Sequence, residues 1–532
     1  MNQIAAQLGE VGLPAPLEEL AARQWDAVVV GGGHNGLTAA AYLARAGKSV
    51  LVLEARERLG GACTLERPFD GDFQISPCAY VVGLLDEVVI QELGLRARGY
   101  ECYIADPNLW VPFADGTSFG QWLDDGKTQA GLEDLGVSAK DIAGYWEYEE
   151  IFDATRKKLR TGPRDTWIGD SPTRAEIEEL LAGEQLMQDI VFDASIADLL
   201  DEYLDDQRLK DALFGQGVIA SWGGPKDKGT ASIKLMHYQG DLEGQGPVWG
   251  YVKGGMGMIS FAIADAAREY GAQLATGVPV AQILPGEGVV LEDGTTIRAT
   301  TVISNADPKV TLRLLEGQDV PGAYRDRIDA WKVRSPVVKF NAVLNALPEF
   351  TAAPGERYPA QATVDLTHGL EAAQDAADAC ARGEIAVGFG EVYVQTGYDP
   401  TPAPEGYHLL SVFGQYAPYD LAHGDWDSRR DEAAQQFISL IDTFAPGFRD
   451  ILVHHEVLGP PHIEERVGLT GGNIFQGEVT PDQMWEHRLS ARTPVAGLYL
   501  CGAATHPAGS VIALNGRNAA MAVLEDAGES LG

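Results

Sequence analysis

Three glycines and one acidic residue near the N-terminus have the spacing of a nucleotide site. The run Gly31-x-Gly33-x-x-Gly36 follows the apolar segment Asp26–Val30. The first glycine permits a tight turn, the second lets the backbone approach a pyrophosphate, and the third lets a helix pack closely on a strand. Glu54 ends the next apolar run, about 20 residues further on, where a carboxylate can accept ribose hydroxyls.

The residues around these glycines predict the elements that such a site requires. Asp26–Val30 is rich in β-branched residues and typical of a strand buried on both faces of a parallel sheet. We expect a helix over Leu37–Gly47, with its N-terminal N–H groups directed at phosphate, and a second strand over Ser49–Ala55. Glu54 in place of a basic residue disfavours a 2′-phosphate, and hence NADP. A glycine-rich turn without a nucleotide is the alternative interpretation.

Length and charge narrow the class of protein. A chain of 532 residues is too long for a single core, which predicts two or more domains. The chain has 77 Asp and Glu against 40 Lys and Arg, a formal net charge of -37. Such a surface repels nucleic acid and anionic bilayers, so we expect no nucleic-acid partner. A transient membrane contact through a local apolar patch and a homodimer both stay open.

The cysteines and the N-terminus give two further expectations. The cysteines at positions 63, 78, 102, 380 and 501 form no C-x-x-C pair and no zinc spacing. This favours a reducing compartment, and we expect neither thiol chemistry nor a metal site. No apolar run is long enough to span a bilayer. Residues 1–23 lack the basic and apolar regions of a secretory signal, so we expect a short amphipathic arm.

The segment after Glu54 separates NAD from FAD. Arg56 and Arg58 are followed by Gly60-Gly61. This segment resembles the second motif of FAD-binding enzymes of the amine oxidase and phytoene desaturase superfamily, in which R-x-G-G follows the ribose-binding acid. The resemblance implies that an arginine and free backbone amides approach the diphosphate–ribityl chain of FAD. The alternative for Arg58 is a solvated surface arginine.

Two distant segments are predicted to return to the same sheet. Gly277–Pro308 is predicted to form a strand, a hairpin and a strand, and in the resembled superfamily this unit carries a valine whose backbone contacts the adenine, here Val280. A β-meander without ligand contact is the alternative. Gly497–Asp526 is predicted to form a strand, a turn at Gly502-Ala503 and a helix. Many FAD enzymes have Gly-Asp at that turn, so Ala503 removes one expected contact to the ribityl chain.

The last motifs indicate a branch of the superfamily. The sequence "GAATHPAG" at Gly502–Gly509 is similar to phytoene desaturase-like proteins rather than to ordinary amine oxidases. With Trp249–Ser260 and Gly468–Glu478, it makes the chain resemble phytoene dehydrogenase-related FAD oxidoreductases from about residue 25 onward. The subgroup it resembles most is that of the pyridine nucleotide-disulfide oxidoreductase domain-containing proteins, known from mitochondria and bacteria. The resemblance implies the cytoplasm, with peripheral membrane association left open, or the mitochondrial matrix of a eukaryote.

The motifs and the resemblance together assign FAD as the cofactor. A second nucleotide site at Gly255-x-Gly257 is disfavoured, because no strong strand precedes it and no acid follows at the right distance. We interpret that segment as a tight turn lining the cavity. The residues assigned to FAD are Gly31, Gly33, Asn35, Gly36, Glu54, Ala55, Arg56, Arg58, Gly60, Gly61, Ala62, Val280, Gly502, Ala503, Val511 and Asn515.

Three residues are candidates for catalysis. Lys339 lies in the predicted strand Ser335–Leu347, and in amine oxidases a lysine on a comparable strand reaches flavin N5 through a water. A buried cation there would stabilise negative charge on the reduced flavin, whereas a lysine snorkelling from an edge strand is the alternative. His506 would act as an acid or base near the isoalloxazine, or cap a turn. His237 completes the set, and we expect substrate contacts from Tyr238, Trp249, Met256, Asn473 and Gln476.

The predicted fold class is α/β. We expect a Rossmann-like FAD-binding domain of the amine oxidase/phytoene desaturase superfamily type, assembled from discontinuous segments, with an α+β substrate domain. Residues 24–110, 245–325 and 490–532 are assigned to the FAD-binding domain, and residues 111–244 and 326–489 to the substrate domain.

These assignments predict a function and two alternatives. We expect an FAD-dependent oxidoreductase that desaturates an apolar, isoprenoid- or lipid-like molecule by hydride transfer to flavin N5. The electron acceptor is left open between oxygen and a quinone. The first alternative is a flavin-dependent double-bond isomerase of the same fold. The second is a flavin-containing binding or scaffold protein. This alternative stays open because Ala503 replaces an expected acid and because the sequence shows no recognisable acid–base constellation.

Overall fold

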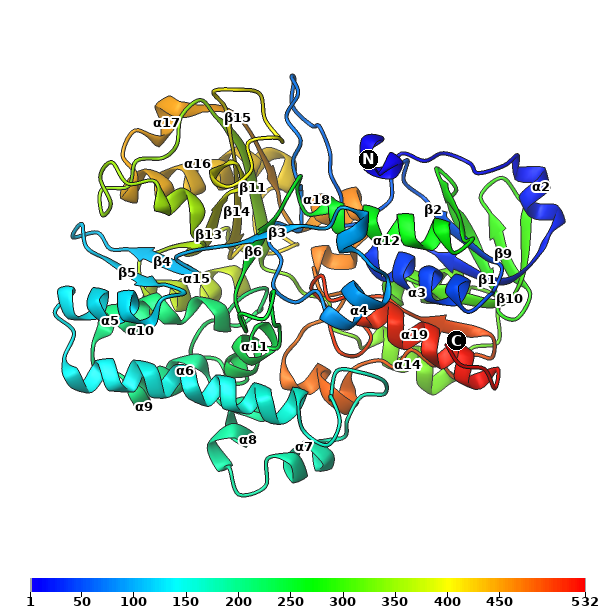
Figure 1. Ribbon diagram of the computed structural model, residues 1–532, viewed down its shortest axis with the longest axis horizontal. Coiled ribbons are helices and arrows are strands. Elements are labelled where there is room, and N and C mark those ends of the chain that lie inside the picture. The colour runs from blue at the N-terminus through cyan, green and yellow to red at the C-terminus, as the bar shows by residue number, and fades with distance from the viewer. Residues whose placement is uncertain (1, 532) are drawn as a thin grey trace.

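The computed structural model describes residues 2–531, and its first sheet joins three distant parts of the chain (Figure 1). The strand order is β7-β2-β1-β10-β9-β8, and β16 pairs with the end of β10. The strands β7, β2, β1 and β10 run parallel to one another, and β16 runs parallel to β10. The strand β9 runs antiparallel to both of its neighbours, β10 and β8. The bounds are β1 Gln24–Val30, β2 Val50–Glu54, β7 Gln273–Thr276, β8 Val280–Leu284, β9 Gly288–Leu291, β10 Thr296–Ser304 and β16 Leu498–Leu500.

Close helix packing covers this sheet. Helix α3 (His34–Arg45) connects β1 to β2 and lies between α12 (Gly257–Glu269) and α19 (Leu514–Asp526) (Figure 1). The approach of α19 to α3 depends on a glycine, because a Cβ on Gly516 would lie 2.2 Å from the carbonyl oxygen of Asn35. The strand–turn–helix–strand order predicted at the start of the chain is therefore confirmed, together with the α/β fold class.

The second sheet is built mainly from residues after position 330. Its order is β15-β11-β14-β13-β12-β4-β5, antiparallel except between β12 and β4. The bounds are β4 Leu109–Pro112, β5 Ser118–Gln121, β11 Val337–Leu344, β12 Val364–Thr367, β13 Phe389–Val394, β14 His408–Gln415 and β15 Leu452–Leu458. Every residue of β11 and β13 is buried, since helices and the cavity cover both faces.

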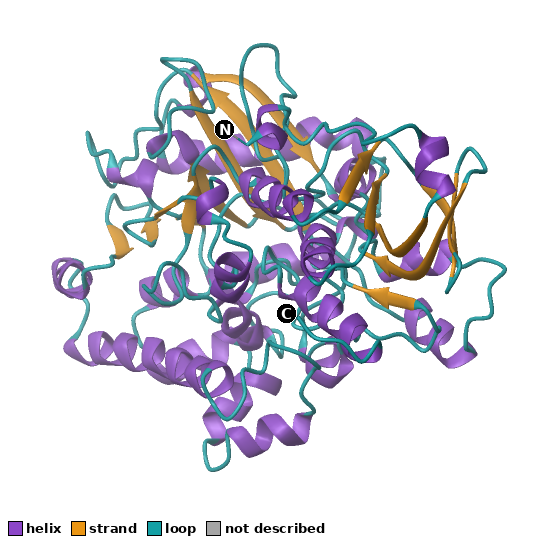
Figure 2. Cartoon of the chain, turned by 45° about the vertical axis from the view of Figure 1, so that its right-hand side comes forward, coloured by secondary structure: helices purple, strands orange, loops and turns teal. Residues whose placement is uncertain are grey.

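Residues 125–237 form a helical layer beside the second sheet. Figure 2 shows these helices below the two groups of strands. They are α5 Asp125–Asp134, α6 Ala139–Arg160, α7 Arg174–Leu180, α8 Gln185–Phe192, α9 Ile196–Tyr203, α10 Gln207–Leu213 and α11 Thr230–His237. A short sheet of β3 (Cys102–Ile104) and β6 (Gly250–Val252) lies between the two halves of the molecule (Figure 1).

Seven further helices of the described chain pack around the two sheets. They are α4 Glu87–Glu92, α13 Pro308–Leu314, α14 Gly322–Asp329, α15 Leu370–Ala381, α16 Trp426–Phe444, α17 Phe448–Ile451 and α18 Pro460–Val467. Of these, α16 lies on a face of the second sheet, where Phe437 contacts Phe340 of β11. None of the helices within residues 2–531 has the length and apolar character needed to cross a bilayer.

The N-terminal arm is attached to the first sheet's domain. It carries α1 (Gln3–Ala6) and α2 (Leu17–Ala22). The side-chain amide of Asn2 donates to Phe261 O at 2.9 Å, and the N–H of Gly12 donates to Thr276 Oγ1 at 2.9 Å. The arm therefore packs along the α12 side of this domain.

The close approach of α19 to α3 gives the first prediction. Gly516→Ala should destabilise the protein by about 1–3 kcal/mol, because the added methyl group overpacks the helix contact. Differential scanning calorimetry would measure this as a lower Tm. The control is Gly131→Ala in α5, where nothing lies within 4 Å of the added Cβ. That change should stabilise the protein by about 0.5–1 kcal/mol, through helix propensity alone. Equal Tm values for the two variants would contradict the packing argument.

Candidate functional site

One cavity of about 480 Å³ extends from the glycine motif to the second sheet. It brings together sixteen of the predicted site residues. Those assigned to the cofactor are Gly31, Gly33, Asn35, Glu54, Ala55, Arg56, Gly60, Gly61, Ala62, Val280, Ala503 and Val511, and those assigned to catalysis or substrate are His237, Trp249, Lys339 and Gln476. Residues predicted from six separate stretches of sequence thus line one space.

The glycine end of the cavity has free hydrogen-bonding groups. Helix α3 begins after Gly33, which provides no side-chain cap, so N–H groups of its first turn have no side-chain partner. Two further buried atoms on this wall, His34 Nε2 and Asn35 Oδ1, have no hydrogen-bond partner within the described chain. Burial lowers the pKa of His34 to about 4, so its ring is neutral. Unsatisfied donors and acceptors at a helix N-terminus fit a phosphate-containing ligand.

Glu54 stands at the end of β2 on the same wall. Its Oε2 accepts from the N–H of Gly32 at 2.7 Å and its Oε1 from the N–H of Arg56 at 2.9 Å. Burial raises the pKa of Glu54, against the lowering effect of these backbone hydrogen bonds. A carboxylate offers about four acceptor positions, so Glu54 retains capacity toward a ribose. This wall therefore fits a dinucleotide.

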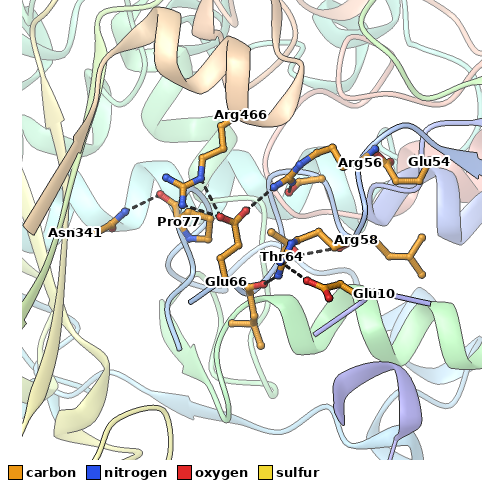
Figure 3. A network of polar contacts seen from close by, with 12 residues as sticks. Glu10, Glu54, Arg56, Arg58, Thr64, Glu66, Pro77, Asn341 and Arg466 are labelled. Atoms are coloured by element: carbon orange, nitrogen blue, oxygen red, sulfur yellow. Dashed lines mark hydrogen bonds and ion pairs between the residues drawn. The ribbon is translucent and has the colours of Figure 1, made fainter. Parts of the chain in front are cut away.

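An ion-pair network joins the two halves of the cavity (Figure 3). Glu66 lies between two arginines, 2.5 Å from Arg56 Nη2 and 2.7 Å from Arg466 Nη2. Arg466, from α18, also pairs with Glu456 of β15 at 2.8 Å. Burial alone would raise the pKa of Glu66, but Arg466 and Arg56 together lower it. The network therefore ties the loop after β2 to the second sheet.

Arg58 lies outside the cavity lining. Its guanidinium donates to Leu65 O at 2.8 Å and to Glu10 Oε1 at 2.5 Å (Figure 3). The N-terminal arm thus covers Arg58, which is neither in the cavity nor the solvated surface arginine of the alternative interpretation. Its position indicates that it attaches the arm to the loop that carries Gly60 and Gly61.

Lys339 lies at the opposite end of the cavity. It is 2% exposed and belongs to β11, which has β14 on one side and β15 on the other. The alternative of a snorkelling lysine on an edge strand is therefore wrong. Its Nζ donates to Ser411 Oγ at 2.7 Å and lies 4.0 Å from the centre of the Tyr80 ring. Burial lowers the pKa of Lys339 to about 7.

His506 is buried next to the cavity without lining it. Its Nε2 lies 2.7 Å from the carbonyl oxygen of Thr166, and burial lowers its pKa to about 3. This contact matches the turn-stabilising alternative better than acid–base chemistry. The other predicted residues that do not line this cavity are Gly36, Gly502, Asn515, Tyr238, Met256 and Asn473. Among these, Asn515 donates to Thr505 O and Ala508 O, and Asn473 to Arg334 O, so both hold loops.

Sequence analysis missed Glu391, Tyr80, Phe413 and Tyr393, which line the cavity around Lys339. Glu391 is 1% exposed in β13, where it is the one acid in the apolar strand Phe389–Val394. A single carboxylate inside such a run is the signal that could have identified it, because burial of an acid is costly without a partner. The neighbours of Glu391 come from other strands, and no local spacing encodes them.

Comparison with known proteins places the chain among flavoproteins. The family model described as "Flavin containing amine oxidoreductase" matches residues 173–524, and that of the "NAD(P)-binding Rossmann-like domain" matches residues 29–82. The chain is 33% identical to pyridine nucleotide-disulfide oxidoreductase domain-containing protein 2 of Rattus norvegicus, over 94% of each chain. It is 24% identical to the lycopene-forming phytoene desaturase of Pantoea ananas, over 94% of this chain and 99% of that one.

A solved structure shows the same fold. The crystal structure of an oxidoreductase from Methanosarcina mazei aligns with a TM-score of 0.59 at 17% identity, covering 94% of this chain and 100% of the other. This likeness shows the fold, and the family model that matches residues 173–524 shows that the cofactor is a flavin.

The role of Glu54 gives the second prediction. Glu54→Gln should lower the flavin content of the purified protein by about tenfold, because a neutral amide is a weaker acceptor for ribose hydroxyls. Absorbance of released flavin per polypeptide would measure the content. Glu57→Gln, at an exposed position three residues further on, is the control and should retain full flavin. Equal flavin content in the two variants would contradict the role assigned to Glu54.

The Glu66 network gives the third prediction. Glu66→Gln should lower the free energy of unfolding by about 3 kcal/mol at pH 7, because two half-buried arginines lose their shared carboxylate. Since the pKa of Glu66 is lowered in the folded protein, this stabilisation is present above the pKa of the unfolded chain and is lost as the pH falls through the folded value. The Tm difference between wild type and variant should therefore shrink in acid. A difference that stays constant down to acid pH would contradict this account.

Proposed function

The chain belongs to the flavin containing amine oxidoreductase family, and from that premise we propose that it dehydrogenates a carbon–carbon bond of an apolar molecule. It is an FAD-dependent oxidoreductase of this superfamily. The observation that carries the finer proposal is that the cavity reaching from the glycine motif to the second sheet has a far end lined mainly by apolar and aromatic side chains. Apolar walls favour a substrate with few polar groups. The similarity to a phytoene desaturase supports the same substrate class.

Different residues along the cavity would have different functions in this reaction. The free N–H groups at the start of α3, together with Glu54, would hold the dinucleotide end of FAD. When bound, FAD supplies a hydride acceptor. The aromatic wall of Trp249, Phe413 and Phe475 would exclude water from the reacting carbons. Lys339 would present a positive charge to the cavity, where it stabilises developing negative charge.

The proposal is tested by anaerobic mixing of the purified flavoprotein with phytoene and limonene in detergent, and with putrescine. We expect at least one hydrocarbon to bleach the flavin absorbance, with a desaturated product detected by mass spectrometry. Bleaching by the amine alone would contradict the proposal. A rearranged double bond without bleaching would support the isomerase alternative, and a flavin reduced by dithionite but by no substrate would support the scaffold alternative. Reoxidation by air or by a soluble quinone would identify the acceptor class.

The fourth prediction concerns Lys339. Lys339→Met should slow flavin reduction by the active hydrocarbon about 10²-fold, because the variant lacks the buried positive charge. Stopped-flow absorbance would measure the rate. Lys253→Met, at an exposed position that forms a surface pair with Glu101, is the control and should keep the wild-type rate. If flavin in the Lys339→Met variant were reduced at the wild-type rate, Lys339 would have only a packing role in β11.

A further inference from the structure

A row of four side chains crosses the second sheet at the far end of the cavity. In the strand register, Lys339 of β11 is opposite Phe413 of β14, Phe413 is opposite Glu391 of β13, and Glu391 is opposite Asp365 of β12. Directly opposite residues on antiparallel strands share a face, with Cβ atoms about 5 Å apart. Lys339, Phe413 and Glu391 all line the cavity, and Asp365 is next in the row. Two acids are therefore neighbours on a buried face.

Neither acid has a cationic partner in direct contact. Glu391 and Asp365 are 1% and 2% exposed. Glu391 Oε1 accepts from Gln216 Nε2 at 3.1 Å and its Oε2 from the Tyr80 hydroxyl at 3.1 Å, both neutral donors. Asp365 Oδ1 has no hydrogen-bond partner within residues 2–531. Two carboxylates cannot both stay ionised so close together without a cation, so the pair retains a proton.

The groups around Glu391 influence the pKa values of the Glu391 and Asp365 carboxyl groups. They are Tyr80 before the short sheet, Gln216 after α10, Tyr393 on the same strand, Lys339 two strands away and Asp365 opposite. Burial raises the pKa of Glu391 to about 7, although Tyr80, Tyr393, Lys339 and Gln216 lower it. Burial and the charge of Glu391 raise the pKa of Asp365 well above its usual range. Asp365 therefore keeps its proton while Glu391 exchanges its own near neutral pH.

We propose that Glu391 accepts the proton released by the substrate, and that Asp365 is a positioning residue that keeps a proton within the pair. This rests on the dehydrogenation proposed above. One C–H bond breaks and its hydrogen leaves with both electrons to FAD. The C–H bond on the neighbouring carbon also breaks, its electrons form the new double bond, and its proton is transferred to a carboxylate oxygen of Glu391. The substrate loses two hydrogens, FAD is reduced by two electrons, and no other reactant is needed.

Two other ionisable side chains on the wall near Glu391, Lys339 and His237, suit this role less well. The Lys339 ammonium already donates to Ser411 Oγ. His237 Nδ1 lies 2.9 Å from Ile233 O, and burial lowers the pKa of this ring to about 4, which makes it a weak base. Glu391 combines a place on the cavity wall with neutral donors that leave its carboxylate free to take a proton.

Infrared spectroscopy of the flavin-loaded protein tests the shared proton without any substrate. Wild type should show the carbonyl stretch of protonated carboxyl groups at pH 7, which is lost in the double variant Asp365→Asn/Glu391→Gln. The control is Asp141→Asn in α6, a carboxylate that is 5% exposed and whose pKa hydrogen bonds lower despite burial. This control should leave the signal unchanged. A wild-type protein without the signal, or a double variant that keeps it, would overturn the proposal.

Stopped-flow reduction by the active hydrocarbon tests the proton transfer. Glu391→Gln should slow flavin reduction about 10²-fold or more, and Glu391→Asp should recover part of the loss. The wild-type rate should rise from acid toward pH 7 as Glu391 ionises, and fall at higher pH as Lys339, whose pKa burial lowers to about 7, loses its charge. Asp365→Asn should leave this rise at the same pH, with a smaller loss of rate than Glu391→Gln, because the amide and the protonated acid are both uncharged. An unchanged rate and pH profile in Glu391→Gln would overturn the role of Glu391. If no compound bleaches the wild-type flavin, the dehydrogenation proposal fails, while the infrared result still decides on the proton pair.

Discussion

The parallel pairing of β1 with both β2 and β10 is the constraint on which the rest of the structure depends. Val30 lies opposite Leu53 on one side and Ser304 on the other, so three strands end at the same edge. Because parallel strands present their carboxyl ends together, the glycines after β1 and Glu54 at the end of β2 form one wall. Ser304 at the end of β10, more than 200 residues further along the chain, lies at the same edge, so a distant segment adjoins this wall.

Two buried carboxylates, Glu54 and Glu391, line the cavity, and a third, Glu66, pairs with two arginines that line it; each of the three is stabilised in a different way. Backbone N–H groups surround Glu54, which leaves acceptor capacity for a ligand. Arginines on both sides hold Glu66 ionised, and this contact joins the two halves of the molecule. Glu391 faces neutral donors and a second acid. Burial alone raises the pKa of all three carboxyl groups. Their different roles, which are ligand binding, structural attachment and proton exchange, therefore follow from the different partners of each acid.

The apolar remainder of the cavity amplifies these charges. Aromatic side chains from the second sheet, Tyr393 and Phe413, and from segments outside it, Tyr80 and Trp249, line the space around Lys339 and Glu391. With water excluded, a single lysine and a single carboxylate exert stronger fields than they would at a surface. The fold by itself does not determine the reaction. In this chain we attribute the chemistry to the ionisable residues Lys339 and Glu391 on the second sheet.

The sequence by itself determined the first βαβ unit, the fold class and the dinucleotide wall, because these depend on local spacing between glycines, an acid and two apolar runs. The predicted strand Ser335–Leu347 likewise contains β11. Only the tertiary structure decided that Lys339 lies on a central strand, that His506 contacts Thr166 instead of the cavity, and that Glu391 faces Asp365. The physical reason is that these neighbours meet across strands from distant parts of the chain, where register, and not spacing along the sequence, selects which side chains share a face.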